Sequence, residues 1–203
     1  MKTKMKRSNC TKCHYPVTTC VCDYVTKKVN NRTKIVVLQH PDEVNLAKNT
    51  VRLLQLQLSD IQVVIGESEN DFASVLNDLP KESTALLYPG KDTIDVYNCS
   101  ALAPKLTHLV VIDGTWKKTN KIYALNPCLH TLQKISFSTI PENQYRIRKA
   151  EQSYSLSTLE AVGHFINIVD GCDNQPLLHL LNGMIEQQTK FMPGHVKARY
   201  FEE

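Results

Sequence analysis

Short runs of apolar residues recur along most of the chain, and many contain the β-branched residues that favour strands. In the run Leu-Val-Val-Ile at 109–112 no polar residue interrupts the pattern, which is typical of a strand buried on both faces. Runs of this kind predict five strands, at residues 34–39, 61–65, 84–88, 108–112 and 133–137.

Between these strands, apolar residues lie three or four positions apart, which is the spacing of an amphipathic helix. The predicted helices are one that begins at a capping Asp42 and carries Leu46, Thr50, Leu53, Leu54 and Leu58, a short one through Phe72, Val75 and Leu76 capped by Ser68 or Asn70, one after Trp116, one over Thr158–Val169, and one over about 176–191. Because strands alternate with helices, the sequence predicts an α/β fold with a mostly parallel sheet covered by helices on both faces.

Residues 1–32 differ from the rest of the chain, being polar, basic and punctuated by cysteines. We expect them to form a small zinc-binding appendage, and residues 33–203 to form one α/β domain. Cys10, Cys13, Cys20 and Cys22 can complete a tetrahedral four-sulfur site, and His14 could replace one thiolate. The alternative is two disulfides or four free thiols. No apolar core follows the basic N-terminus, so we expect a cytoplasmic protein, in which metal binding is favoured.

Composition places the chain among ordinary globular proteins, with 203 residues of which 42% are apolar and no apolar run long enough to span a bilayer. The net charge of +4 is unevenly spread, because residues 1–34 are rich in Lys and Arg and contain one acid, Asp23. Residues 117–121 and 146–149 add two further basic clusters. This pattern suits a polyanion such as RNA, although any one cluster could be a solvated surface.

The stretch Asp113-Gly114-Thr115-Trp116 lies where a predicted buried strand passes into a predicted helix. In open α/β sheets that edge is where ligands bind. The chain has no other tryptophan, and the indole of Trp116 could stack on a flat ligand or fill the core.

A second strand exit, Leu87-Tyr88-Pro89-Gly90, also has a small residue that lets a ligand approach the backbone, or is simply a turn. Further along, Arg146, Arg148 and Lys149 could clamp phosphates. In Leu156-Ser157-Thr158, a hydroxyl could instead cap the following helix, with Glu160 in its first turn.

Several common enzyme signatures are missing from the sequence. The chain has no G-x-G-x-x-G, no P-loop, no G-x-S-x-G and no zinc-deaminase pattern. These absences weaken the case for a Rossmann dinucleotide enzyme, a Rossmann-type methyltransferase, an α/β-hydrolase or a deaminase.

Taken together, the sequence blocks resemble the DTW-domain family, the tRNA-uridine aminocarboxypropyltransferases. The blocks, in the family's order, are the C-x-x-C and C-x-C cluster, His40-Pro41 followed by a helix with Lys48 and Thr50, Leu87–Gly90, Ile112–Lys118 with an intact Asp-x-Thr-Trp, Tyr145–Lys149 and Leu156–Ala161. Between 167 and 191 no family block is found, so the last helix rests on periodicity alone.

The resemblance implies a SPOUT-like α/β fold, compatible with a backbone knot, and S-adenosylmethionine as donor of a 3-amino-3-carboxypropyl group. It implies N3 of a uridine in tRNA as acceptor and methylthioadenosine as leaving group. Because N3–H is a weak acid, a base should remove its proton. Asp113 is the candidate for that base or for an orienting carboxylate, and its alternative role is to hydrogen-bond its own turn.

The remaining site residues follow from the same resemblance. Those expected at the donor are Leu87, Tyr88, Pro89, Gly90, Ile112, Thr115, Trp116, Leu156, Ser157 and Thr158. Those expected at tRNA phosphate are Lys117, Lys118, Lys121, Arg146, Arg148 and Lys149, with the arginines also able to hold the methionine carboxylate. Two alternatives stay open: a SPOUT-type RNA methyltransferase that uses the same donor, and a non-enzymatic zinc protein that binds RNA.

Overall fold

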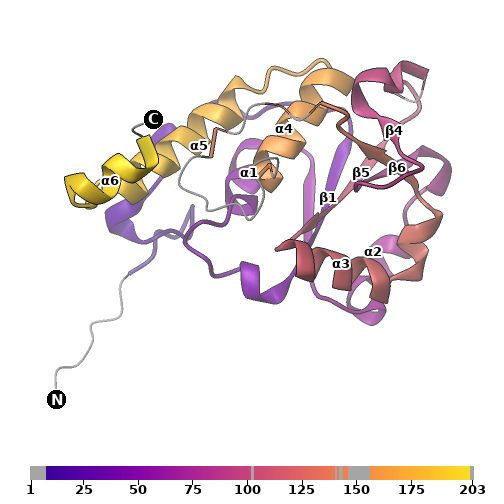
Figure 1. Cartoon of the computed structure of the whole chain (residues 1–203), viewed down its shortest axis with the longest axis horizontal. Helices are drawn as coiled ribbons and strands as arrows, with labels where there is room; N and C mark the ends of the chain where they lie inside the picture. The colour runs from indigo at the N-terminus through magenta and orange to yellow at the C-terminus, as the bar shows by residue number, and fades with distance from the viewer. Residues whose placement is uncertain (1–7, 102, 140, 142–143, 146–155, 202–203) are drawn as a thin grey trace.

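The computed structural model describes residues 8–101, 103–139, 141, 144–145 and 156–201 (Figure 1). Its centre is a six-stranded sheet with the order β2-β1-β5-β3-β6-β4, in which every pairing is parallel. The strands are β1 Lys34–Gln39, β2 Ile61–Ile65, β3 Thr84–Leu87, β4 Ile94–Asp95, β5 His108–Asp113 and β6 Gln133–Ser136. All five predicted strands are confirmed, with ends that differ by at most one residue, and the two-residue β4 is the one the sequence did not predict.

Helices cover both faces of the sheet, as the alternation of elements predicts (Figure 1). The helices are α1 Val51–Gln57, α2 Glu69–Asn77, α3 Trp116–Leu125, α4 Thr158–Val169, α5 Gln175–Thr189 and α6 Gly194–Phe201. Side chains of α1, α4 and α5 pack on one face, and those of α2 and α3 pack on the other. The α/β class and the parallel sheet are therefore confirmed.

Strand β1 supplies side chains to both cores by simple alternation. In β1, Ile35 and Val37 join the core with α1, α4 and α5, whereas Val36 and Leu38 join the core with α2 and α3. All four are fully buried. A strand buried on both faces cannot carry a polar residue until it reaches its end, so the first polar side chains mark the carboxyl edge of the sheet.

The helix that carries Leu53 and Leu54 is present as α1, but the prediction that it begins at Asp42 is wrong. Asp42 lies in a 3-10 turn, Pro41–Glu43, and α1 does not begin until Val51. The side chain of Asn49 accepts hydrogen bonds from the backbone N–H of Val51, at 2.8 Å, and of Arg52, at 3.4 Å. Asn49 therefore caps the N-terminus of α1. Leu46, which was expected on the apolar face of this helix, is exposed.

The helix predicted over about 176–191 is confirmed as α5, and a further short helix, α6, which the sequence did not predict, follows it. Helix α5 ends at Thr189, and α6 begins at Gly194 directly after Pro193. Proline has no backbone N–H and cannot continue a helix, which places the break before it. Among the described residues, no helix is long and apolar enough to cross a membrane.

Candidate functional site

Asp113 ends β5 at the carboxyl edge of the sheet, beside the end of β1 and the start of α4. Its carboxylate accepts one hydrogen bond from Gln39 Nε2 at 2.8 Å and one from Thr158 Oγ1 at 2.5 Å. Its backbone carbonyl accepts from the N–H of His40 at 3.0 Å. Two donors to one carboxylate fix its orientation.

The N-terminus of α4 is held by a capping box built from Ser157 and Glu160. Glu160 is fully buried, and its carboxylate accepts from the backbone and hydroxyl of Ser157 and from the backbone N–H groups of Gln144 and Tyr145. Four donors satisfy a carboxylate that would otherwise be costly to bury. The predicted capping role is confirmed for Ser157. The same bonds attach residues 144–145 to the helix that presents Thr158 to Asp113.

Trp116 is the first residue of α3, one turn of chain away from Asp113. Its indole Nε1 is buried and has no hydrogen-bond acceptor in the described part of the chain. Thr115, the residue before it, has an extended backbone and an exposed side chain. A buried donor without an acceptor costs free energy, and such a group next to a polar edge is a natural contact for a ligand.

The residue that follows β3, Tyr88, contacts α3. Tyr88 stacks on Tyr123 of α3 with ring centroids 4.3 Å apart, and its hydroxyl donates to Asn120 at 2.7 Å. Burial raises the pKa of Tyr88. Pro89 and Gly90 are exposed. Three other residues predicted at the donor differ in burial. Ile112 is buried in the core with α2 and α3, whereas Leu87 and Leu156 are partly exposed.

A charged network lies next to the Asp113 turn. His40 Nε2 donates to Glu67 at 2.8 Å while His40 Nδ1 accepts from the backbone N–H of Asp42 at 3.2 Å. Lys121 approaches the other oxygen of Glu67 at 2.7 Å. The pKa of Glu67 is lowered, first by Lys121 and then by His40. These contacts hold His40, whose backbone touches Asp113, in one position.

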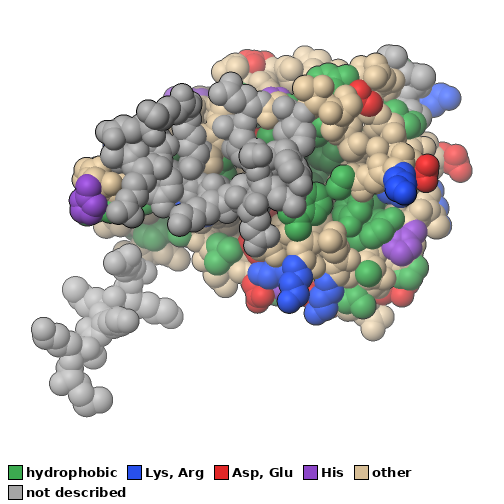
Figure 2. Space-filling model, viewed as in Figure 1, with side chains coloured by type: hydrophobic (Ala, Val, Ile, Leu, Met, Phe, Trp, Pro, Cys, Tyr) green, Lys and Arg blue, Asp and Glu red, His purple; other side chains and the backbone are tan. Residues whose placement is uncertain are grey.

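The three lysines predicted to contact RNA differ in their partners. Lys118 pairs with Glu43 at 2.8 Å and with Asp42 at 3.3 Å, and Glu43 is the main cause of its raised pKa. Lys121 pairs with Glu67, whereas Lys117 is exposed and makes no ion pair with any described residue. Figure 2 shows Lys and Arg side chains close to acidic ones at the lower edge of this face. Phosphate binding by these lysines stays a prediction, and Arg146, Arg148 and Lys149 lie outside the described residues.

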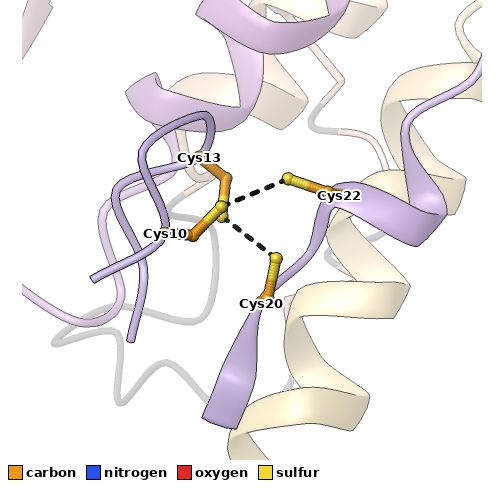
Figure 3. Close-up of side chains that lie close together, drawn as sticks. All are labelled: Cys10, Cys13, Cys20 and Cys22. Atoms are coloured by element: carbon orange, nitrogen blue, oxygen red, sulfur yellow. Dashed lines mark hydrogen bonds between the residues drawn. The ribbon is translucent and has the colours of Figure 1, made fainter. Parts of the chain in front are cut away.

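The four N-terminal cysteines converge from two short segments, and their sulfur atoms point toward one another (Figure 3). The sulfurs all lie within 4.8 Å of one another, with 3.6 Å between Cys10 and Cys22 and between Cys13 and Cys20. A zinc ion with four Zn–S bonds of about 2.3 Å needs sulfurs about 3.8 Å apart. None of the four forms a disulfide. The cluster could therefore hold one metal ion, and the predicted set of thiols is brought together.

Backbone amides prepare part of this cluster for a cation. The N–H groups of Cys13 and Lys12 act on the Cys10 sulfur and lower the pKa of Cys10 to about 6. Such N–H···S bonds orient thiolate ligands and stabilise their negative charge. His14, which could have replaced one thiolate, is exposed and has a positive φ of 60°. It is not among the residues that surround the common point.

The cysteine segment, residues 8–24, carries the four cysteines and packs against α5 and the residues just before α1 by specific contacts. Tyr15, 1% exposed, donates its hydroxyl to the backbone carbonyl of Asn49 at 2.5 Å and also contacts the Met184 sulfur at 3.2 Å. A methyl group added at Gly183 would lie 2.2 Å from the Tyr24 ring. The small residue therefore lets the 3-10 turn Cys22–Tyr24 lie directly on α5.

Three residues of the site were missed from sequence: Gln39, Glu67 and Glu160 as a buried anchor. Each acts on a partner that is distant in the chain, since Gln39 is 74 residues from Asp113, Glu67 is 27 residues from His40 and Glu160 is 16 residues from Gln144. One signal was present for Gln39, because it is the first polar residue after the apolar run of β1. The sequence does not show that Gln39 lies opposite Asp113, because that depends on the parallel register of β1 and β5.

Known proteins resemble the chain over most of its length. A protein named tRNA-uridine aminocarboxypropyltransferase 2 from Drosophila melanogaster is 31% identical over 202 residues, covering 91% of this chain and 80% of that protein. The protein of the same name from Mus musculus is 27% identical, covering 91% of this chain and 65% of its own length. The tRNA-uridine aminocarboxypropyltransferase A of Arabidopsis thaliana is 23% identical, covering 92% and 83%. No solved structure matches the chain significantly.

The model of the DTW domain matches residues 7–189, which include the cysteine cluster, the sheet and α5. A match over that much of the sequence confirms the predicted resemblance, and the chain belongs to the DTW-domain family.

Proposed function

We propose that this protein transfers the 3-amino-3-carboxypropyl group of S-adenosylmethionine to N3 of a uridine in tRNA, with release of methylthioadenosine. The names of its relatives support the reaction. The observation that carries the proposal is the position of Asp113, fixed by Gln39 and Thr158 at the carboxyl edge of the sheet. Both the family signature and the expected ligand edge of an α/β sheet meet at this residue.

In the reaction, the bond from uridine N3 to the donor's Cγ forms, the bond from Cγ to sulfur breaks, and the N3 proton must leave. Asp113 is the proposed acceptor of that proton. Alternatively, its carboxylate orients the uridine so that N3 faces Cγ of the donor. Gln39 and Thr158 keep the carboxylate in one rotamer, so that it does not have to reorganise when the acceptor arrives. Positioning then decides which carbon of the sulfonium reacts.

The donor is proposed to lie along the exits of β3 and β5 and the start of α4. Its proposed contacts are Leu87, Tyr88, Pro89, Gly90, Ile112, Thr115, Trp116, Leu156, Ser157 and Thr158. Support comes from Trp116, whose buried Nε1 lacks an acceptor among the described residues and could donate to the bound donor. S-adenosylmethionine, when bound, supplies the group to be transferred, and the protein supplies its orientation.

The metal is proposed to be Zn²⁺ held by Cys10, Cys13, Cys20 and Cys22, within a zinc-binding segment of residues 1–32 that precedes a DTW (SPOUT-like) catalytic domain of residues 33–203. The sulfur separations suit four Zn–S bonds, and a site closed by four thiolates is typical of structural zinc. The ion would fix the loop that packs on α5. A cytoplasmic location is part of the same proposal.

The direct test is to incubate purified protein with S-adenosylmethionine and unmodified tRNA and to analyse the nucleosides by mass spectrometry. An aminocarboxypropyl uridine supports the proposal. A methylated nucleoside would make the protein a methyltransferase instead, and tRNA binding without donor binding or product would make it a non-enzymatic RNA-binding protein.

A further inference from the structure

A groove outside the Asp113 site lies between the cysteine segment and the end of α5. Its volume is about 530 Å³, within the range of pockets that hold small ligands. The residues that line it are Ser8, Pro16, Val17, Thr18, Thr19, Gln188 and Phe191. Neither the proposed proton transfer nor the proposed donor contacts use any of them.

The groove combines an aromatic ring with hydrogen-bonding groups. Phe191 is 69% exposed and Val17 is 56% exposed, so two large apolar side chains face solvent on either side of the same groove. Side-chain hydroxyls from the cysteine segment and the amide of Gln188 complete the lining. An exposed aromatic ring with polar groups beside it offers a flat ligand both a stacking face and hydrogen bonds.

The lining of the groove is anchored on both sides. The backbone N–H of Val17 donates to the carbonyl of Ser8 at 3.0 Å, and Asn9 and Pro16 form an antiparallel bridge. On the other side, the N–H of Met192 donates to the carbonyl of Thr189 at 3.0 Å, which fixes the turn that carries Phe191. The two walls are thus set by backbone bonds.

The described lining of the groove carries no negative charge, and a cation lies beside its aromatic ring. None of the described residues that line the groove is acidic, and residues 8–22 contain a lysine and no acid. Residues 186–203 contain Lys190, Lys197 and Arg199 and the acids Glu186, Glu202 and Glu203, and the carboxylate of Glu186 accepts a hydrogen bond from the hydroxyl of Tyr24. Lys190 Nζ lies 5.7 Å from the centroid of the Phe191 ring, so a cation stands next to the exposed ring.

We propose that this groove binds an unpaired nucleotide of the tRNA, with its base stacked on Phe191 and its phosphate close to Lys190. An aromatic ring beside a cation is the arrangement by which proteins hold single-stranded nucleic acid, because every base offers a π-face and every linkage offers a charge. The inference rests on the proposed function, since it adds a second contact for the same tRNA. It also gives the cysteine segment a role in substrate binding through the wall that it forms.

The test is to measure binding of unmodified tRNA to the full-length protein for Phe191→Ala, Phe191→Trp and the wild type. Tyr97→Ala is the matched control, because Tyr97 is another exposed aromatic residue, 46% exposed, and does not line the groove. We expect Phe191→Ala to raise the Kd for tRNA about fivefold or more, the scale of a lost base stack, while Phe191→Trp keeps or tightens binding. KM for tRNA should rise with kcat unchanged.

The salt dependence separates stacking from charge. Phe191→Ala should leave the slope of log K against log salt unchanged, whereas Lys190→Gln should reduce it by about one unit. An unchanged Kd in Phe191→Ala, or an equal effect of Tyr97→Ala, would overturn the proposal. So would a wild-type dimer that Phe191→Ala converts to a monomer, because the groove would then hold a second copy of the chain.

The same measurements separate a failure of the groove assignment from a failure of the proposed function. If the wild type modifies tRNA but Phe191→Ala binds it equally well, only the groove assignment fails. If the wild type neither binds nor modifies tRNA, the proposed function fails and the groove assignment fails with it.

Discussion

Replacing Asp113 by Asn removes the charge at the proposed reaction centre while keeping the shape of the side chain. The carboxylate now accepts from Gln39 Nε2 and Thr158 Oγ1. After Asp113→Asn, a half-turn of the Gln39 amide lets its oxygen accept from the new N–H₂ group, and Thr158 still finds an oxygen. Two charge-assisted hydrogen bonds become neutral ones, each weaker by about 1 kcal/mol, so we expect a stability loss of roughly 1–2 kcal/mol.

The same geometry predicts a larger loss for Asp113→Leu. That change leaves the Gln39 amide without its acceptor at a position only 4% exposed, which costs about 1–3 kcal/mol beyond the lost hydrogen bonds. For a chain of this size each kcal/mol lowers Tm by about 2–4 °C, so thermal unfolding should separate the two variants. Equal Tm values for both would refute the hydrogen-bond assignment.

Activity should respond far more strongly than stability. We expect Asp113→Asn to slow single-turnover transfer by about 10²-fold or more, the scale of a lost general base, with little change in donor affinity. If Asp113 is the base, raising the pH toward the ionisation of uridine should rescue Asp113→Asn proportionally more than the wild type. If it only orients, both should gain alike. Wild-type turnover in Asp113→Asn at neutral pH would refute both roles.

Three further predictions concern the supports of the fold. Gly183→Ala should lower stability by about 1–3 kcal/mol, because the new methyl would lie 2.2 Å from Tyr24, whereas Gly194→Ala, with no atom within 4 Å, should lose far less in the same denaturant titration. Elemental analysis should find about one zinc per chain and much less in Cys13→Ser, and two disulfides without metal in protein made in a reducing cytosol would contradict this. Because partners lower the pKa of Glu67, its stabilising effect is present above the unfolded pKa and is lost as pH falls through the lower folded value. Glu67→Gln should therefore flatten the acid side of the stability curve and converge with the wild type at the acid end, and parallel curves would refute the network.

The elements that were predicted well are those whose signals are local. The apolar run of β5 and the capping box at Ser157 each lie within a few neighbouring residues, and both elements begin where predicted. The start of α1 was missed because Asn49, not Asp42, supplies the capping oxygen, and both residue types are good caps. Propensity alone does not choose between two such candidates.

The residues of the candidate site are named by continuous motifs in the sequence, whereas the residues that support them are not. Asp113 and the four cysteines are recognisable because each motif is continuous in the chain. Gln39 and Glu67 become site residues through the sheet order, which brings the ends of β1 and β5 together. Sequence patterns predict that the strands exist and are buried, but they do not give the order in which the strands pair.

The nucleoside product of the reaction tests the central claim most directly. Purified protein, S-adenosylmethionine and unmodified tRNA should give a uridine that carries the 3-amino-3-carboxypropyl group on N3, with an equal amount of methylthioadenosine. Asp113→Asn, with its fold intact, should form this product at least about 10²-fold more slowly. A methylated nucleoside, or no modified nucleoside from protein that binds both substrates, would contradict the account.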